Sequence, residues 1–234
     1  MSLTFGRGPL AQGRAGRLNF EPPDHVIYLE PLGRRVRAVK HGTTVIDSDD
    51  VLLVHESGQL ARYLLPIDDV HVDARPLPGF DGYVVVSWDS VDAWFEEDER
   101  VFVHPRDPYH RIDTFLTSRR VEVRIDDVVV AKSTRAKSLY ETALPVRYYL
   151  PFGDVNRALL VLSETVTECA YKGMARHWSA TIHGRTVDDV AWTYESNVLR
   201  EGEPIEGLIA FYNERVDLRV DGNLLERPIT KWSR

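Results

Sequence analysis

The chain is poor in cysteine and lysine and has no long apolar segment. Cys169 is the only cysteine, so an intramolecular disulfide and a four-cysteine zinc site are both excluded. No apolar run approaches the roughly 18 residues of a membrane helix, and the first residues lack the apolar core of a signal peptide. We therefore expect a cytoplasmic protein with no membrane partner. Only five of the 29 basic residues are lysine, a bias typical of GC-rich bacterial genomes.

Cofactor and nucleic-acid signals are also missing. With a net charge of -7, the chain lacks the phosphate-neutralising surface that nucleic-acid binding requires. The glycine-rich stretch with Arg7, Arg14 and Arg17 is interpreted as a solvated arm. A phosphate loop, a dinucleotide glycine fingerprint and a Gly-x-Ser-x-Gly elbow are all absent, and residues 104–110 read as an exposed proline loop rather than a metal site. We expect no cofactor, no metal and no nucleic-acid partner.

Short runs rich in valine, isoleucine and tyrosine dominate what is present. They alternate with tight-turn signals such as His183-Gly184 and Asp221-Gly222. No long amphipathic helix is evident, although Asp69 and Asp154 are candidates to cap one short element each. The pattern predicts a mainly β, antiparallel protein with little helix. The expected strands are Val36–Val39, Val51–His55, Tyr83–Trp88, Val121–Ile125, Val128–Ala131, Trp178–Ile182, Leu208–Tyr212 and Val216–Val220.

An ungapped internal repeat relates residues 34–70 to residues 119–155. Twelve of the 37 aligned pairs are identical, against about two or three expected from ordinary composition. A third echo of the opening strand occurs at residues 215–221, which suggests that residues 120–126 close one module and open the next. We therefore predict two tandem modules that are closely packed as one unit. Their expected boundaries are a flexible arm at 1–23, a first module at 24–118, a second module at 119–222 and a tail at 223–234.

Residues that differ between the copies are the better functional candidates. Repeated residues such as Glu141 and Tyr148 are more simply explained as scaffold, although buried carboxylates also occur in active sites. The second copy alone has Cys169 and Lys172, followed by Gly173. On one strand the first two would face opposite sides, but a turn at the glycine would bring them together, and a nearby ammonium favours the thiolate. The alternative is a small buried cysteine and a solvated lysine.

Aromatic residues of the second module could form a wall for a ligand. Trp192 and Tyr194 are two residues apart, so on a strand they share a face, and Trp178 lies on another strand. Aromatic side chains on short strands are also common core residues, and that interpretation stays open.

The second copy resembles a known bacterial and fungal family, the domain of unknown function 427. The resemblance implies a β-tent fold, and the first copy looks like a degenerate member. It implies no settled activity; some family labels mention nucleotidyltransferases, but no glycine-serine loop with a paired-aspartate strand is present here. The family's usual Cys-Pro-Tyr-Lys-Gly has alanine at its second position here. The matching motifs are Arg120-Val121, Leu139-x-Glu141, Tyr148-Tyr149-Leu150-Pro151, Asp154-Val155, Cys169-Ala170-Tyr171-Lys172-Gly173, Ala191-Trp192-Thr193-Tyr194, Phe211 and Arg215-Val216.

Our leading hypothesis is a small-molecule pocket in the second module, in which Lys172 engages an anionic group. An enzyme with Cys169 as nucleophile and Lys172 nearby is the alternative, and a structural or protein-interaction module is a further one. The sequence names neither the ligand nor the oligomeric state. The candidate catalytic residues are Cys169 and Lys172, and the candidate ligand-binding residues are Glu141, Tyr148, Tyr171, His177, Trp178, Trp192 and Tyr194.

Overall fold

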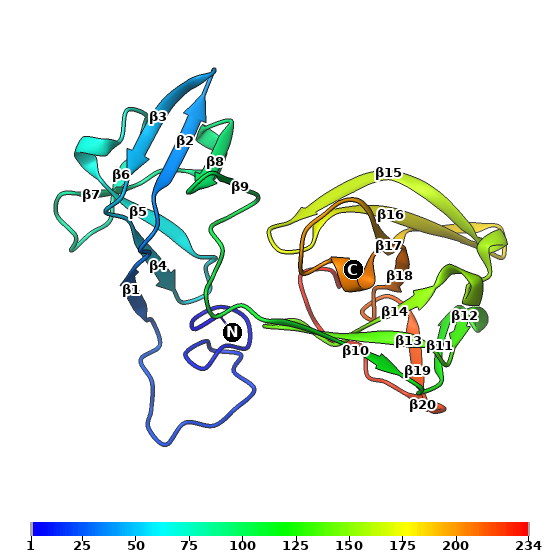
Figure 1. The fold of residues 1–234 in the computed structure, drawn as a ribbon. Helices are drawn as coiled ribbons and strands as arrows, with labels where there is room; N and C mark the ends of the chain where they lie inside the picture. Colours follow the sequence, from blue (N-terminus) through cyan, green and yellow to red (C-terminus); the bar gives the residue numbers. More distant parts are fainter. Residues whose placement is uncertain (1, 234) are drawn as a thin grey trace. The chain divides into compact units, whose positions relative to one another are not determined.

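The protein consists of antiparallel β-sheets, as the sequence predicts. The computed structural model describes residues 2–233, and the helical segments in that range are five single 3₁₀ turns. The chain divides into two compact units, one ending at His110 and the other beginning at Arg111 (Figure 1). Each unit contains its own sheets and its own buried core.

The first unit has a five-stranded sheet in the order β1-β4-β5-β7-β6 and a four-stranded sheet in the order β3-β2-β8-β9. Two 3₁₀ turns, η1 and η2, complete it. Its elements are β1 (Ile27–Pro31), β2 (Val36–Lys40), β3 (Thr43–Ser48), β4 (Leu52–Glu56), β5 (Arg62–Pro66), η1 (Ile67–Asp69), β6 (Arg75–Pro76), β7 (Tyr83–Val85), η2 (Trp88–Ser90), β8 (Ala93–Glu96) and β9 (Glu99–Val101). Thr4, near the start of the chain, is buried and donates a hydrogen bond to the backbone carbonyl of Glu56 (3.0 Å).

The second unit has a seven-stranded sheet in the order β10-β13-β14-β18-β17-β16-β15 and a four-stranded sheet in the order β12-β11-β19-β20. Its elements are β10 (Ile112–Thr117), β11 (Val121–Ile125), β12 (Val128–Ser133), β13 (Ala136–Glu141), β14 (Arg147–Pro151), η3 (Phe152–Asp154), η4 (Arg157–Leu159), β15 (Leu160–Cys169), β16 (Gly173–Ile182), β17 (Arg185–Val198), η5 (Glu203–Ile205), β18 (Leu208–Phe211), β19 (Asp217–Val220) and β20 (Asn223–Leu224).

Residues 34–70 and 119–155 form the same series of elements. The hairpins β2–β3 and β11–β12 both contain a register shift, and each is followed by two further strands and one 3₁₀ turn. An isolated bridge closes each series, Ile46 with Val70 and Ala131 with Val155. After that the units differ: the second inserts the long strands β15, β16 and β17, where the first has only the two-residue β6.

The strand at residues 121–125 is not shared between the modules. β11 pairs with β12 and β19, which both belong to the second unit. In the first unit the matching position beside β2 is taken by β8, so that unit completes its own sheet. The echo at residues 215–221 thus marks the pairing partner of the opening strand rather than a third opening strand.

Two hairpin turns form where the sequence predicts them, but the two expected aspartate caps do not. His183-Gly184 and Asp221-Gly222 form the turns of β16–β17 and β19–β20, and all four residues have positive φ, as predicted. The expected aspartate caps are wrong. Asp154 ends its 3₁₀ turn instead of starting it, and its carboxylate accepts hydrogen bonds from Ser133 and Arg135.

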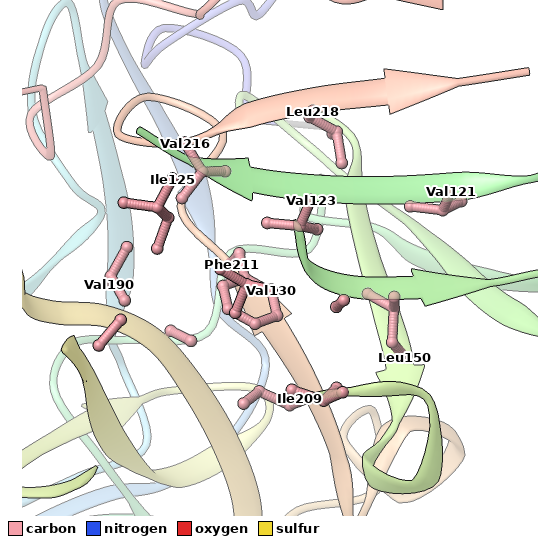
Figure 2. Packing of buried hydrophobic residues seen from close by; sticks show 14 of the residues in the cluster. Val121, Val123, Ile125, Val130, Leu150, Val190, Ile209, Phe211, Val216 and Leu218 are labelled. Carbon is pink, nitrogen blue, oxygen red and sulfur yellow. The ribbon is translucent and has the colours of Figure 1, made fainter. Parts of the chain in front are cut away.

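The largest core lies between the two sheets of the second unit (Figure 2). Alternate residues of β11, such as Val121 and Val123, point toward Leu150 and Ile209 of the seven-stranded sheet, because successive side chains of a strand face opposite ways. The opposite face of the seven-stranded sheet carries a separate buried cluster that includes Tyr149 and Trp192. We call this second face the aromatic face, and define it by Leu139, Tyr149, Ala175, Trp192, Tyr194, Ile205 and Ala210.

Candidate functional site

The residues that the sequence singles out at 169–173 form a buried hairpin loop. Cys169 pairs with Gly173, so Ala170, Tyr171 and Lys172 make the connection between β15 and β16. All three are buried, with exposures of 3–5%, although hairpin loops usually lie at the surface. Gly173 has a φ of +93°, and a side chain at this position would clash with the backbone carbonyl of Asn197. The predicted turn at the glycine is therefore present.

Lys172 and Glu141 form a buried ion pair. The Nζ of Lys172 donates to Oε2 of Glu141, and each side chain is only 6% exposed. The carboxylate comes from the end of β13, so the loop at 170–172 is tied to the far part of the sheet. In the first unit the matching Glu56 has a different partner, Arg62. The expectation of a solvated Lys172 is wrong, because a carboxylate of the same chain already neutralises it.

Arg147 has also exchanged its partner relative to its counterpart Arg62. Its guanidinium donates two parallel hydrogen bonds to the Glu214 carboxylate, both 2.7 Å long, and these side chains are 5% and 0% exposed. Burial alone would raise the pKa of Glu214, but hydrogen bonds from Arg147 and Thr230 bring it below its ordinary value. Two-point contact of this kind fixes the direction of both side chains.

Two aromatic side chains of the aromatic face contact each other, and Tyr212 packs against them. The indole Nε1 of Trp192 donates to the hydroxyl of Tyr149 (3.0 Å), and Trp192 lies 4.4 Å from the ring of Tyr212. Burial raises the pKa of Tyr149 and of Tyr194 above the ordinary tyrosine value. A negative charge on Glu141 or Cys169 raises both further, so the thiol and the carboxylate lie within electrostatic reach of these hydroxyls.

His177 lies on the same face, opposite Trp192 on the neighbouring strand. It is 3% exposed, its Nε2 is 2.9 Å from the Thr167 hydroxyl, and its ring stacks on Tyr212. Its Nδ1 is buried without a hydrogen-bond partner among residues 2–233. Burial lowers the pKa of His177, the nearby Arg215 lowers it further, and Asp189 opposes the change. The imidazole is therefore held in its neutral form.

Tyr148 and Trp178 do not belong to this group. Both pack against the core between the sheets, on the opposite face from Trp192 and His177. Trp178 donates to the Thr193 hydroxyl and lines a surface hollow of about 470 Å³ with Phe152, Arg157, Ala158 and Leu160. Trp178 directly follows His177 on β16 and pairs with Ala191, so its side chain points to the other face of the sheet from His177 and Trp192. The predicted wall of Trp178, Trp192 and Tyr194 is thus divided between two faces.

Cys169 is half-buried at the end of β15. It is three residues from Lys172, whose ammonium is engaged by Glu141. The arrangement offers one thiol, one ion pair and several buried hydroxyl and indole donors on a single face. Such a set is suited to holding a polar ligand, and the thiol adds a possible nucleophile.

Arg147 and Glu214, which form the second buried ion pair, are not among the candidates that the sequence names. Arg147 recurs in the first copy as Arg62, which favours a scaffold interpretation, and Glu214 lies outside the repeat. The signal was present, since Glu214 immediately precedes the Arg215-Val216 motif. Its pairing with Arg147 spans 67 residues and has no local sequence pattern.

Between residues 2 and 233, no group of three or more His, Cys, Asp or Glu side chains is arranged to hold a metal ion. In the same range, no helix is long and apolar enough to span a bilayer.

The order of motifs in the second unit agrees with a known family. Residues 113–222 match the domain of unknown function DUF427. This match supports the resemblance for the second unit. The matched segment, called the DUF427 domain below, includes β11 to β19 and the residues of the aromatic face. A comparison with curated proteins found no match.

Proposed function

We propose that the DUF427 domain binds a small molecule on its aromatic face, beside Cys169 and Lys172. The observation that carries this proposal is the buried Lys172–Glu141 pair in a loop that the first unit lacks. Removing two charges from water costs several kcal/mol per ion, and stability alone is a weak reason to keep them. Clusters of buried titratable groups are frequent at functional sites.

The chemistry of the pair constrains the ligand. An anionic group would have to replace the Glu141 carboxylate at Lys172, whereas a polar molecule with both a donor and an acceptor can bind to the intact pair. Tyr149, Trp192 and Tyr194 supply apolar surface next to it. We therefore propose a polar, partly planar molecule, and an anion only where it exchanges with Glu141.

A thermal-shift screen of polar metabolites tests this proposal. A compound that binds only the folded protein raises the melting temperature. We expect at least one nucleoside, amino acid or sugar derivative to do so with the wild type and not with a Lys172→Met/Glu141→Leu double variant. Replacing both charges with apolar side chains avoids the 3–5 kcal/mol loss that follows when one buried partner is left alone.

The matched control removes an exposed ion pair. Arg185 and Asp126 form such a pair, with side chains 71% and 47% exposed. An Arg185→Ala/Asp126→Ala variant should respond to the same compounds as the wild type. Equal responses in all three proteins, or none in the wild type, would reject the site.

Covalent catalysis by Cys169 is the second candidate function. It is favoured by the position of the thiol, which is half-buried and close enough to Tyr149 and Tyr194 for its charge to affect them. Iodoacetamide alkylation measured against pH tests it directly, because Cys169 is the only thiol. A reaction midpoint clearly below the ordinary cysteine pKa of about 8.5 would support a nucleophile, and an ordinary midpoint would argue against it.

We infer further that the first unit is a degenerate copy of the DUF427 domain that supports the second. The recurring elements and the two matching bridges favour duplication. The single cysteine is compatible with function in the reducing cytoplasm of a bacterium.

A further inference from the structure

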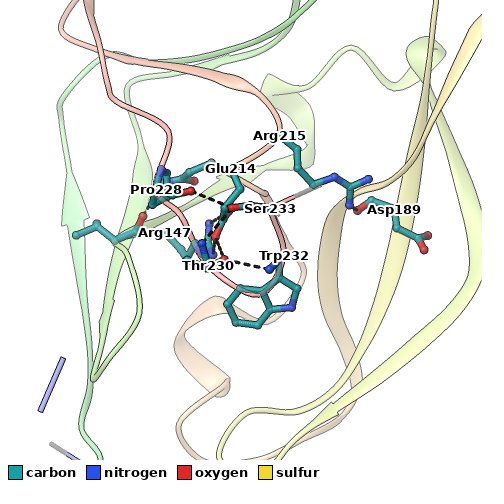
Figure 3. Close-up of polar contacts among 10 residues, drawn as sticks. Arg147, Asp189, Glu214, Arg215, Pro228, Thr230, Trp232 and Ser233 are labelled. Carbon is teal, nitrogen blue, oxygen red and sulfur yellow. Dashed lines mark hydrogen bonds and ion pairs between the residues drawn. The ribbon is translucent and has the colours of Figure 1, made fainter. Parts of the chain in front are cut away.

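The last described residues of the chain lie against the aromatic face. We call residues 227–233 the strap. Arg227 begins it with a hydrogen bond to Asp217 of β19 (2.7 Å), and the Thr230 hydroxyl donates to Oε1 of Glu214 (2.7 Å). Trp232 then places its ring 6.0 Å from that of Tyr212. Figure 3 shows Thr230 and Trp232 next to the Arg147–Glu214 pair.

The strap adds a third ring around one guanidinium. The carbon centre of the Arg147 guanidinium lies 5.5 Å from the ring of Trp192, 5.8 Å from that of Tyr212 and 5.6 Å from that of Trp232. The first two rings belong to the sheet and the loop after it. The third comes from the strap, and a cation is attracted to each ring face. Arg147 and its carboxylate partner thus form a site to which the strap contributes one ring and one hydroxyl.

The strap is held by few side chains. Ile229 is 95% exposed, and Lys231 and Ser233 are also exposed. The internal hydrogen bonds are local: the Trp232 amide donates to the Thr230 hydroxyl, and the Ser233 hydroxyl donates to the Pro228 carbonyl. No β-ladder includes residues 227–233. A segment with so few buried contacts opens more readily than the sheet beneath it.

We propose that the strap is an intramolecular occupant of a binding site for a planar aromatic ring that carries a hydroxyl group. The ring takes the place of Trp232 over Arg147 and Tyr212, and the hydroxyl takes the place of Thr230 at Glu214. Arg147 and Glu214 neutralise each other, so the site favours a neutral ligand over a charged one. This inference rests on the proposed small-molecule function. It adds the class of ligand and a strap that must leave the site before the ligand binds.

The first arm of the test uses hydrogen exchange and no ligand. In the full chain carrying Trp232→Ala, we expect the peptide covering the strap to exchange at least tenfold faster than in the wild type. Ile229→Ala changes an exposed side chain of the same segment and should leave exchange unaltered. Thr230→Val, which keeps the shape but loses the donor, should show an intermediate increase. If the strap of Trp232→Ala exchanges hydrogen as slowly as that of the wild type, Trp232 does not hold the strap in place and the proposal fails.

The second arm asks what fills the site. A blocked peptide of sequence Pro-Ile-Thr-Lys-Trp-Ser, titrated calorimetrically, should bind Trp232→Ala at least tenfold more tightly than Ile229→Ala. Tryptophol, an indole with a hydroxyl, should displace it, and indole-3-acetate should do so at least tenfold less well, because a carboxylate cannot donate to Glu214. Equal peptide affinity for both variants would show that the strap does not block the site. If tryptophol does not displace the peptide, a hydroxylated aromatic ring is not the ligand.

The two proposals can fail separately. A metabolite screen without any hit rejects the site at Lys172 and Glu141, but leaves the exchange and peptide results to stand. In the Trp232→Ala background, adding Lys172→Met and Glu141→Leu should leave peptide binding unchanged, which supports a strap site that stands apart from that ion pair; loss of binding would overturn a site formed by Arg147, Tyr212 and Glu214 alone.

Discussion

Glu141 and Arg147 occupy the same positions in the repeat as Glu56 and Arg62 but form ion pairs with different partners. Their counterparts Glu56 and Arg62 bond to each other, whereas Glu141 bonds to Lys172 and Arg147 to Glu214. One ion pair has thus been replaced by two, each using a residue from the longer part of the second unit. The repeated residues keep their positions and change their partners, so identity between the copies does not imply identity of role.

At the same scale, His177 should make stability depend on pH. Its folded pKa is lowered by burial, so the unfolded chain binds more protons in the window just below the ordinary value of about 6.5. The stabilisation is complete above that value and is lost as pH falls toward the folded pKa. We expect the unfolding free energy of the wild type to decrease between pH 7 and 5.5, by at most about 1.4 kcal/mol per pH unit from this group.

Urea unfolding at several pH values measures this dependence. His177→Asn should show a shallower decrease than the wild type, whatever its absolute stability. His183→Asn changes an exposed histidine in the β16–β17 turn and should retain the wild-type slope. Parallel slopes for all three proteins would contradict a neutral buried His177.

At the scale of elements, the hairpin β15–β16 carries most of the residues that only the second unit has. It positions Cys169, Lys172 and His177, and its loop packs on residues 197–202 through the Leu199 amide and the Lys172 carbonyl (3.1 Å). Close backbone approach explains why glycine stands at position 173.

Gly173→Ala should therefore be strongly destabilising. The new methyl group meets the Asn197 carbonyl, and the residue must keep a positive φ. We expect a loss of about 3 kcal/mol in unfolding free energy. Gly184→Ala is the matched control, since it has positive φ in a hairpin turn but open space around it, and should lose about 1 kcal/mol. Chemical denaturation of both variants checks this, and equal losses would show that packing at Asn197 is unimportant.

Element type was predictable where local chemistry decides it. The strand at residues 121–125 and the turns at 183–184 and 221–222 follow from alternation and from residues that tolerate positive φ. The long strand β15 was missed because its exposed apolar and polar residues alternate incompletely and are interrupted by a register shift. Tyr148 and Trp178 face the core between the sheets, whereas their chain neighbours Tyr149 and His177 face the other side. Which of the two alternating faces carries a ligand site has no local sequence signal, because it depends on pairing between strands that are distant in the sequence.

At the scale of the whole molecule, each unit contains a core of its own. Leu65 and Leu150 are an identical pair in the repeat, and both are fully buried, one in each core. They allow the same substitution to be made in the two units.

Leu65→Ala and Leu150→Ala should act on different parts of the unfolding curve. Each removes a buried side chain at a cost of about 2–5 kcal/mol. We expect calorimetry to resolve two transitions, one lowered by each variant. A single transition that both variants lower equally would mean that the units unfold as one.

The register shift in β15 also determines where the seven-stranded sheet ends. Val161 and Val166 on this outer strand are 56% and 50% exposed, which would favour the addition of another strand. Between them the pairing breaks, and Thr165 is turned inward by a hydrogen bond from its hydroxyl to Asp189 (2.8 Å). An incoming strand would lose its ladder at that point, so the kink protects the chain against edge-to-edge aggregation while leaving its apolar side chains in water.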